Sequence, residues 1–192
     1  DIPVPTYGNL NWSGNFGEYA FLTRLRAEQL RDIGPVLAPH SAFLLAQGVE
    51  TLAFRMQAHV ANARIVAEWL EADPRIEFVN WAGLPSHAHF DRAKKYLPKG
   101  PSSIFTFGVK GGRDAGRTFI ESVNLASHVA NVGDAKTLVI HPASTTHAQL
   151  TEQQLVDAGV LPGLVRISVG IEDPDDIIYD LDQALALATE GK

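Results

Sequence analysis

Apolar residues recur at steps of three and four along residues 45–70, which is the spacing of one face of a helix. The stripe consists of Leu45, Val49, Leu52, Met56, Val60, Ala63, Val66 and Leu70. We expect a first helix to end near Gly48 and a second to end at Asp73-Pro74. Residues 1–15 show no steady period and predict an extended arm or loop, whereas residues 16–34 predict a helix that stops at Gly34.

The rest of the chain alternates short strand-like runs with helical ones. The runs RIEFVNWAG, SSIFTFGVK, LASHVANVG, TLVIHP and LVRISVG predict strands, and GGRDAGRTFIESV, LTEQQLVDAG and DPDDIIYDLDQALALATEG predict helices. A chain of this kind is typical of an α/β fold. We therefore predict a two-layer sandwich in which helices cover one face of a mixed sheet.

The run LVRISVGIED places an arginine inside a strand pattern. Side chains leave a strand on alternating sides, so the core side holds Val165, Ile167, Val169 and Ile171, and the other side holds Arg166, Ser168 and Gly170. Small neighbours leave the guanidinium room to bind a carboxylate or phosphate through two donors. The alternative is an arginine that lies in solvent or pairs with an internal Asp or Glu.

Charge and composition narrow the choice of partners. The formal net charge is −6 and Lys and Arg form no cluster, so nucleic acid and anionic membrane are poor partners. A local site for a small anion is compatible with this net charge. The chain has no cysteine, which excludes disulfides and thiol nucleophiles and favours a cytoplasmic protein. No apolar run is long enough to predict a membrane span.

Other candidate motifs favour structural roles. His141 and His147 lie six apart, which matches no common zinc spacing, and the HAH run at 87–89 predicts a turn before a helix that begins near Phe90. KGGRDAG predicts a strand end and a helix start, not a phosphate loop. The sequence has no Gly-x-Ser-x-Gly, His-Glu-x-x-His or dinucleotide-binding glycine motif, and we predict no metal site.

Three longer runs carry a family resemblance. AFLLAQGVETLAFRMQAHVANA, NVGDAKTLVIHPASTTHAQLTEQQLVDAG and LVRISVGIEDPDDIIYDLDQAL follow one another over most of the chain. Together they resemble the C-terminal part of the pyridoxal-phosphate (PLP) enzymes of cysteine and methionine metabolism. The resemblance implies a mixed, largely antiparallel sheet with helices on one face, as in aspartate-aminotransferase-type enzymes. It also implies an arm and linking helix over 1–35 and a substrate-binding domain over 36–192.

The resemblance implies roles for individual residues. Arg166 falls on the arginine that holds the α-carboxylate of the substrate, with Asn131 and Thr146 expected beside it. The family binds PLP through a lysine in a Ser-x-Thr-Lys motif, which this chain lacks; its lysines are Lys94, Lys95, Lys99, Lys110, Lys136 and Lys192. We therefore expect no catalytic or cofactor-binding residue here. The expected partners are an N-terminal cofactor domain, a small amino acid and further copies in a homo-oligomer.

Within the family, NWSGNFGEYAFLTRLRAEQLRDIG, YLPKG and NVGDAKTLVIHP most resemble O-acetylhomoserine sulfhydrylases. The expected function is the C-terminal domain of a transferase that replaces the acetate of O-acetylhomoserine with sulfide or a thiol. The chain alone is expected to be inactive and to bind no PLP. The alternatives are a cystathionine γ-synthase, a methionine γ-lyase, an O-succinylhomoserine sulfhydrylase, or a non-catalytic binding module of the same fold.

Overall fold

The computed structural model describes residues 2–189, so Lys192 lies outside the described part. The chain divides into two compact units, Asp1–Glu50 and Thr51–Lys192. This division follows contacts within the chain. The expected functional division into residues 1–35 and 36–192 stays a prediction.

The first unit consists of short helical pieces followed by one longer helix. They are η1 (Pro5–Tyr7), α1 (Trp12–Phe16), η2 (Gly17–Tyr19), α2 (Ala20–Arg24), the π-helical η3 (Leu25–Leu30), α3 (Arg31–Ile33) and α4 (Pro39–Glu50). The extended arm or loop predicted for residues 1–15 is wrong where η1 and α1 form. The side chain of Asn11 caps α1 by accepting a hydrogen bond from the Gly14 backbone N–H at 2.9 Å. The predicted stop at Gly34 is confirmed, because its φ of 70° is left-handed.

The predicted helix end at Gly48 is wrong, because α4 continues through this residue to Glu50. Gly48 has no heavy atom within 4 Å of an added Cβ, so nothing in the described structure requires a glycine there. The break falls instead at Thr51, before α5 (Leu52–Ala72) begins in the second unit.

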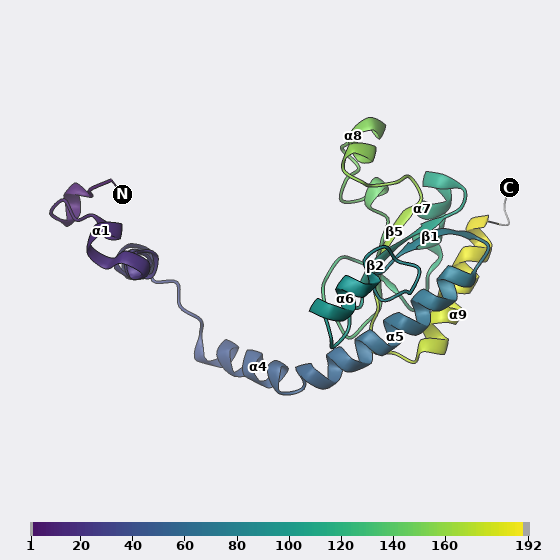
Figure 1. Cartoon of the computed structure of the whole chain (residues 1–192), viewed down its shortest axis with the longest axis horizontal. Helices are drawn as coiled ribbons and strands as arrows, with labels where there is room; N and C mark the ends of the chain where they lie inside the picture. The colour runs from purple at the N-terminus through teal and green to yellow at the C-terminus, as the bar shows by residue number, and fades with distance from the viewer. Residues whose placement is uncertain (1, 190–192) are drawn as a thin grey trace. The chain divides into compact units, whose positions relative to one another are not determined.

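The second unit is built on one five-stranded sheet in the order β1-β2-β5-β4-β3 (Figure 1). Its strands are β1 (Ile76–Asn80), β2 (Ile104–Val109), β3 (Ser127–His128), β4 (Leu138–Ile140) and β5 (Leu164–Ser168). Among the strands of residues 2–189, β3 and β4 form a parallel pair and the other neighbouring pairs are antiparallel. The prediction of a mixed, largely antiparallel sheet is confirmed.

Three helices cover one face of this sheet: α5, α7 (Gly112–Ser122) and α9 (Pro174–Thr189). Figure 1 shows α5 and α9 side by side along the sheet, and both contribute to one apolar core with the strands. At the centre of that core, Phe107, Phe119, Ile167 and Leu181 are fully buried. The shorter elements are α6 (Phe90–Tyr96), η4 (Pro142–Ser144) and α8 (Glu152–Asp157). The predicted two-layer sandwich is therefore confirmed.

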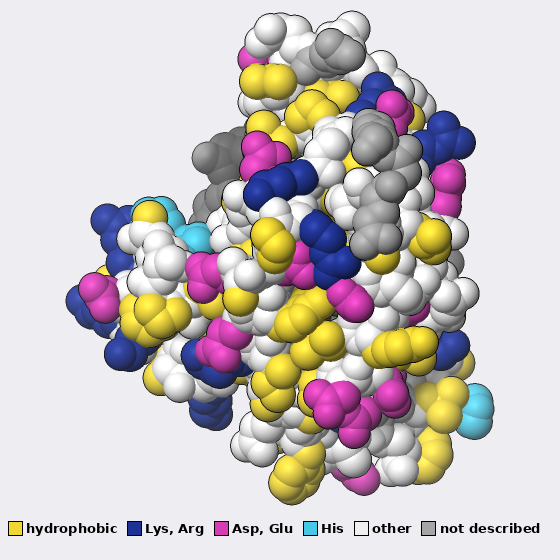
Figure 2. Space-filling view, turned by 90° about the vertical axis from the view of Figure 1, so that its right-hand side faces the viewer, with side chains coloured by type: hydrophobic (Ala, Val, Ile, Leu, Met, Phe, Trp, Pro, Cys, Tyr) yellow, Lys and Arg dark blue, Asp and Glu magenta, His cyan; other side chains and the backbone are white. Residues whose placement is uncertain are grey.

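The apolar stripe of the long helical region is buried only in its second half. Ala63, Val66 and Leu70 have no exposed surface, whereas Leu52 is 42% exposed and Val49 is 65% exposed. Figure 2 shows one face of the molecule on which apolar, acidic and basic side chains are interspersed. Helical spacing thus predicted the helix correctly but did not predict how far its apolar face is covered.

The core side of the LVRISVGIED strand ends earlier than its alternation predicts. Val165, Ile167 and Val169 are fully buried, but Ile171 is 39% exposed. The strand ends at Ser168, and the N–H of Ile171 then donates to the Ala135 carbonyl at 2.9 Å. Once the chain leaves the strand conformation, alternation no longer decides which side a residue takes.

Candidate functional site

Arg166 lies at the centre of β5, between two neighbouring strands. In the antiparallel register its partners are Thr106 on β2 and Ile140 on β4. Residues directly opposite one another in an antiparallel pair share a face, so these three side chains lie on the face away from α5, α7 and α9. Thr106 was not among the predicted site residues, because strand alternation within one run does not say which strand pairs with it.

Arg166 is half-buried as a residue, and its guanidinium makes one exposed hydrogen bond among the described residues. Its Nη2 donates one long hydrogen bond of 3.4 Å to the backbone carbonyl of Asn131. Over residues 2–189, the ion pairs within 4.0 Å do not include Arg166. A guanidinium without a carboxylate partner has donors left for an anion, and its planar geometry suits a bidentate carboxylate.

The end of β5 is held by two buried polar residues of α5. The Nδ1 of His59 donates to the Val169 carbonyl at 2.7 Å, since a carbonyl only accepts. The Nδ2 of Asn62 donates to the carbonyls of Gly170 at 3.2 Å and Glu172 at 2.7 Å. Both residues were missed from the sequence, although polar residues at core spacing in an apolar stripe are a usable signal. They fix the strand that carries Arg166.

Close backbone contacts explain why position 170 is a glycine. Room for the Arg166 guanidinium does not explain it. A Cβ at Gly170 would lie 2.5 Å from both the Ala135 carbonyl oxygen and the Thr137 nitrogen. Thr137 donates through its N–H and its hydroxyl to the Glu172 carboxylate at 2.7 and 2.9 Å. Its hydroxyl oxygen also accepts from the Gly170 N–H at 2.9 Å. This network locks the turn that follows β5.

The structure brings the backbone of Asn131 to Arg166, whereas the hydrogen bond described for Thr146 is to His147 and not to Arg166. The exposed Asn131 side chain accepts from the Val132 N–H at 2.8 Å through Oδ1, which leaves its amide nitrogen as the donor available to a ligand. Thr146 is exposed, and its hydroxyl lies 2.9 Å from the Nδ1 of His147.

His141 has a structural role directly after β4, where its ring lies against Gly116 of α7. Its ring is fully buried, with Nε2 2.6 Å from the Pro162 carbonyl and Nδ1 2.9 Å from the Ser144 hydroxyl. Nε2 must carry the hydrogen that faces the carbonyl, so Nδ1 accepts from Ser144. Burial lowers the pKa of His141 below its ordinary value, and the hydrogen bond to Pro162 opposes this shift.

The HAH run forms the predicted turn before α6. The N–H of His89 donates to Nδ1 of His87 at 3.1 Å, and Nε2 of His87 lies 2.8 Å from the Asn80 side-chain oxygen. Among the residues that the structure describes, no group of three or more His, Cys, Asp or Glu is placed to hold a metal ion. Within the same residues, no helix has the length and apolar content to cross a membrane.

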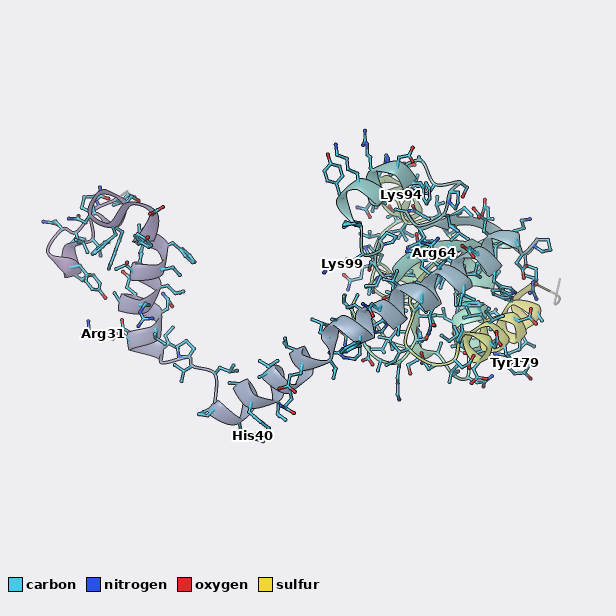
Figure 3. The ribbon with its side chains drawn as sticks, turned by 60° about the horizontal axis from the view of Figure 1, so that its bottom comes forward. Arg31, His40, Arg64, Lys94, Lys99 and Tyr179 are labelled. Carbon is cyan, nitrogen blue, oxygen red and sulfur yellow. The ribbon has the colours of Figure 1, made fainter. Side chains whose placement is uncertain are left out.

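The described residues do not by themselves fit pyridoxal phosphate. Lys94, Lys95, Lys99, Lys110 and Lys136 are all exposed, and two of them are labelled in Figure 3. Lys110 donates to the Pro74 carbonyl at 2.5 Å, at the far end of the sheet from the turn after β5. No lysine is therefore enclosed beside Arg166 among the residues described.

The fold and this arginine define a class of domain: a two-layer α/β sandwich with a half-buried arginine on the sheet face that α5, α7 and α9 do not cover, here called the open face. A comparison with family models matches residues 16–186 to the family described as Cys/Met metabolism PLP-dependent enzyme. The chain belongs to this family.

Known relatives carry related names. The chain is 47% identical to O-acetyl-L-homoserine sulfhydrylase 1 of Thermus thermophilus over 184 residues, which are 96% of the chain and 44% of that protein. It is also 47% identical to homocysteine synthase of Schizosaccharomyces pombe, covering 97% of the chain and 43% of the relative. The chain therefore spans less than half the length of these relatives.

A solved structure from Campylobacter jejuni has the same fold. It is assigned as an O-acetylhomoserine (thiol)-lyase and contains an N'-pyridoxyl-lysine-5'-monophosphate residue. The TM-score is 0.84 at 41% identity, and the match covers 96% of this chain and 44% of that one. The expected fold, of the type found in the C-terminal part of PLP-dependent enzymes, is confirmed.

Proposed function

We propose that this chain is the substrate-binding part of a PLP-dependent transferase that forms homocysteine or a related thioether from O-acetylhomoserine and sulfide or a thiol. The observation that carries the proposal is Arg166, half-buried on the open face of the sheet with one long bond to a backbone carbonyl. The names of the relatives support the choice of substrate.

In this proposal Arg166 holds the α-carboxylate of the amino acid through two parallel N–H donors. The amide nitrogen of Asn131 donates to the same carboxylate, and Thr146 lies at the mouth of the site. Because the carboxylate is held at two points, the amino group and Cα of the substrate take one orientation. That is catalysis by positioning, for which a lysine is a poor substitute.

The test is the replacement of Arg166 by Lys in the complete enzyme. We expect kcat/KM for O-acetylhomoserine to fall on the order of a hundredfold, because a point charge does not reproduce the bidentate geometry. Arg113→Lys is the matched control, since Arg113 also donates to a backbone carbonyl, that of Ala143 at 2.9 Å. Equal activities for the two variants would remove Arg166 from the site.

The cofactor lysine is proposed to lie in a part of the protein outside this chain. Reduction with borohydride in the presence of PLP, followed by mass spectrometry, tests this. The 192-residue chain is expected to carry no specific pyridoxyl label and no activity, while the complete enzyme carries the label on a lysine absent here. A stoichiometric label on Lys94, Lys99 or Lys136 would contradict the proposal.

The leaving group separates the remaining alternatives. Steady-state rates of the complete enzyme with the acetyl and succinyl esters of homoserine, with cysteine as acceptor, and with methionine alone distinguish sulfhydrylase, cystathionine synthase and lyase. A strong preference for the succinyl ester would replace our first choice. Complete inactivity with every substrate would favour the non-catalytic module.

We propose that the complete protein is a cytoplasmic homo-oligomer. The absence of cysteine supports the cytoplasmic location and has no bearing on the oligomer.

A further inference from the structure

A cleft between α5 and α6 plays no part in the proposed substrate site. Its volume is about 400 Å³, within the size range of small-molecule sites. The residues around it come from α5, from the loop after β1, from α6 and from the loop that follows α6. Arg166, Asn131 and Thr146 are not among them.

The walls of this cleft are held in place by specific contacts. Phe90, Ala93 and Lys94 lie at helical spacing on one face of α6, Leu97 follows at the end of that helix, and Val60 lines the cleft from α5. Gly100 has a φ of 116° and packs so closely that a Cβ would lie 2.4 Å from Val60. The indole N–H of Trp81 donates to the Ser102 carbonyl at 3.1 Å, which ties the loop after α6 to the end of β1.

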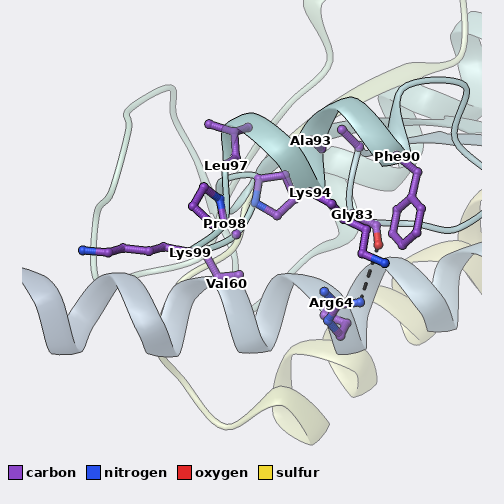
Figure 4. A pocket seen from close by; sticks show the side chains of 12 residues that line it. Val60, Arg64, Gly83, Phe90, Ala93, Lys94, Leu97, Pro98 and Lys99 are labelled. Atoms are coloured by element: carbon purple, nitrogen blue, oxygen red, sulfur yellow. Dashed lines mark hydrogen bonds between the residues drawn. The ribbon is translucent and has the colours of Figure 1, made fainter.

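One end of the cleft carries two cations. The guanidinium of Arg64 lies 5.6 Å from the Trp81 ring centre, and its Nη1 donates to the Gly83 carbonyl at 3.5 Å. The Lys94 ammonium lies 5.0 Å from the centre of the Phe90 ring. Figure 4 shows the Lys94 nitrogen on the side of the cleft where Arg64 meets Gly83, while the Lys99 side chain extends the other way.

No lining residue of the cleft is acidic. The carboxylate of Glu68 lies 3.7 Å from Arg64 Nη1, but both side chains are about half exposed. An exposed pair at that separation is weak and is displaced readily by a better-placed anion. The other walls are apolar, from Val60, Leu97, Pro98 and Pro101. The cleft is therefore amphiphilic: apolar along its length and positive at one end.

We propose that this cleft is a second ligand site, which binds a small organic carboxylate with an apolar body. The carboxylate lies between Arg64 and Lys94, and the apolar body lies against Val60 and Leu97. The proposal does not depend on the reaction proposed above, because the two sites share no residue.

The test is isothermal titration of the complete, cofactor-loaded protein with 3-phenylpropionate and with its neutral amide. We expect saturable binding of the acid and about fivefold weaker binding of the amide, the value of one exposed charge interaction. Lys94→Gln is expected to weaken binding of the acid by about fivefold. Lys95→Gln is the matched control, because Lys95 is the next residue of α6 and lies over Tyr96 instead of lining the cleft.

Arg166→Gln separates this site from the substrate site, and it should leave the affinity for the acid unchanged. Equal affinities for the acid and the amide, or equal losses in Lys94→Gln and Lys95→Gln, would overturn the proposal. So would binding that disappears in Arg166→Gln, or an absence of binding because another part of the complete protein fills the cleft. Lys94 is exposed, so its replacement does not threaten folding.

Discussion

The two faces of the sheet use the same strands for different purposes. On the helix-covered face, Phe107 and Ile167 are fully buried and packed into one apolar core. On the opposite face, their sequence neighbours Thr106 and Arg166 are only half-buried and lie opposite each other. The second face is not uniformly exposed, since Ile140 and Leu138 of β4 are buried on it as well. Its half-buried polar residues are therefore confined to the part around Thr106 and Arg166.

The largest expected effect comes from truncating a buried side chain on the helix-covered face of the sheet. Phe107→Ala should lower the free energy of unfolding by about 3–5 kcal/mol, because it removes a large side chain from a closed core. Thr106→Ala, one residue away on the open face, should change it by no more than about 1 kcal/mol. Urea unfolding of both variants measures the difference. Similar losses would mean that the two faces are equally structural.

A smaller loss is expected at the turn where β5 leaves the sheet. Gly170→Ala should cost about 1–3 kcal/mol, because the new Cβ would press on the backbone at Ala135 and Thr137. The control is Gly48→Ala in α4, where an added Cβ meets nothing within 4 Å and should stabilise the helix by about 0.5–1 kcal/mol. Thermal unfolding of each variant gives the sign directly; a neutral Gly170→Ala would show that this turn adapts.

The buried ring of His141 should also make the free energy of unfolding depend on pH. Burial lowers the pKa of this ring in the folded state, so below the ordinary value of 6.5 the unfolded chain takes up more protons than the folded one. Stability is therefore complete above about pH 6.5 and is lost as the pH falls towards the lowered pKa. Urea unfolding from about pH 7.5 to about pH 5.5 should show this loss.

His141→Gln isolates this contribution from that of the other histidines. The glutamine amide can still donate to the Pro162 carbonyl but does not titrate. Its stability should therefore fall less steeply over the same pH range. An unchanged slope would mean that His141 does not account for the dependence.

The smallest effect is expected on the open face. Arg166→Gln should change the free energy of unfolding by no more than about 0.5 kcal/mol, because the arginine loses only one 3.4 Å bond to Asn131. Urea unfolding of this variant, set beside the activity of Arg166→Lys, shows whether the residue binds a ligand or supports the fold. A large loss of stability would place Arg166 with Phe107 as a structural residue.

Local patterns in the sequence predicted most elements of the second unit. Helical spacing located α5, α7 and α9, and β-branched runs located the strands, because both periodicities reflect which side of an element is buried. The same reasoning failed in residues 1–15, where the Asn11 cap supports α1, and at Gly48, which α4 includes. It also failed at Ile171, which follows the end of the strand.

The sequence by itself determined that Arg166 leaves β5 on the side opposite Val165 and Ile167, since alternation is a property of the strand alone. Only the tertiary structure decided that Thr106 and Asn131 are its neighbours and that no described carboxylate pairs with it. It likewise brought Arg64 of α5 to Lys94 of α6, in a chain whose sequence shows no basic cluster. Contacts of this kind depend on strand order and helix packing, which no local pattern contains.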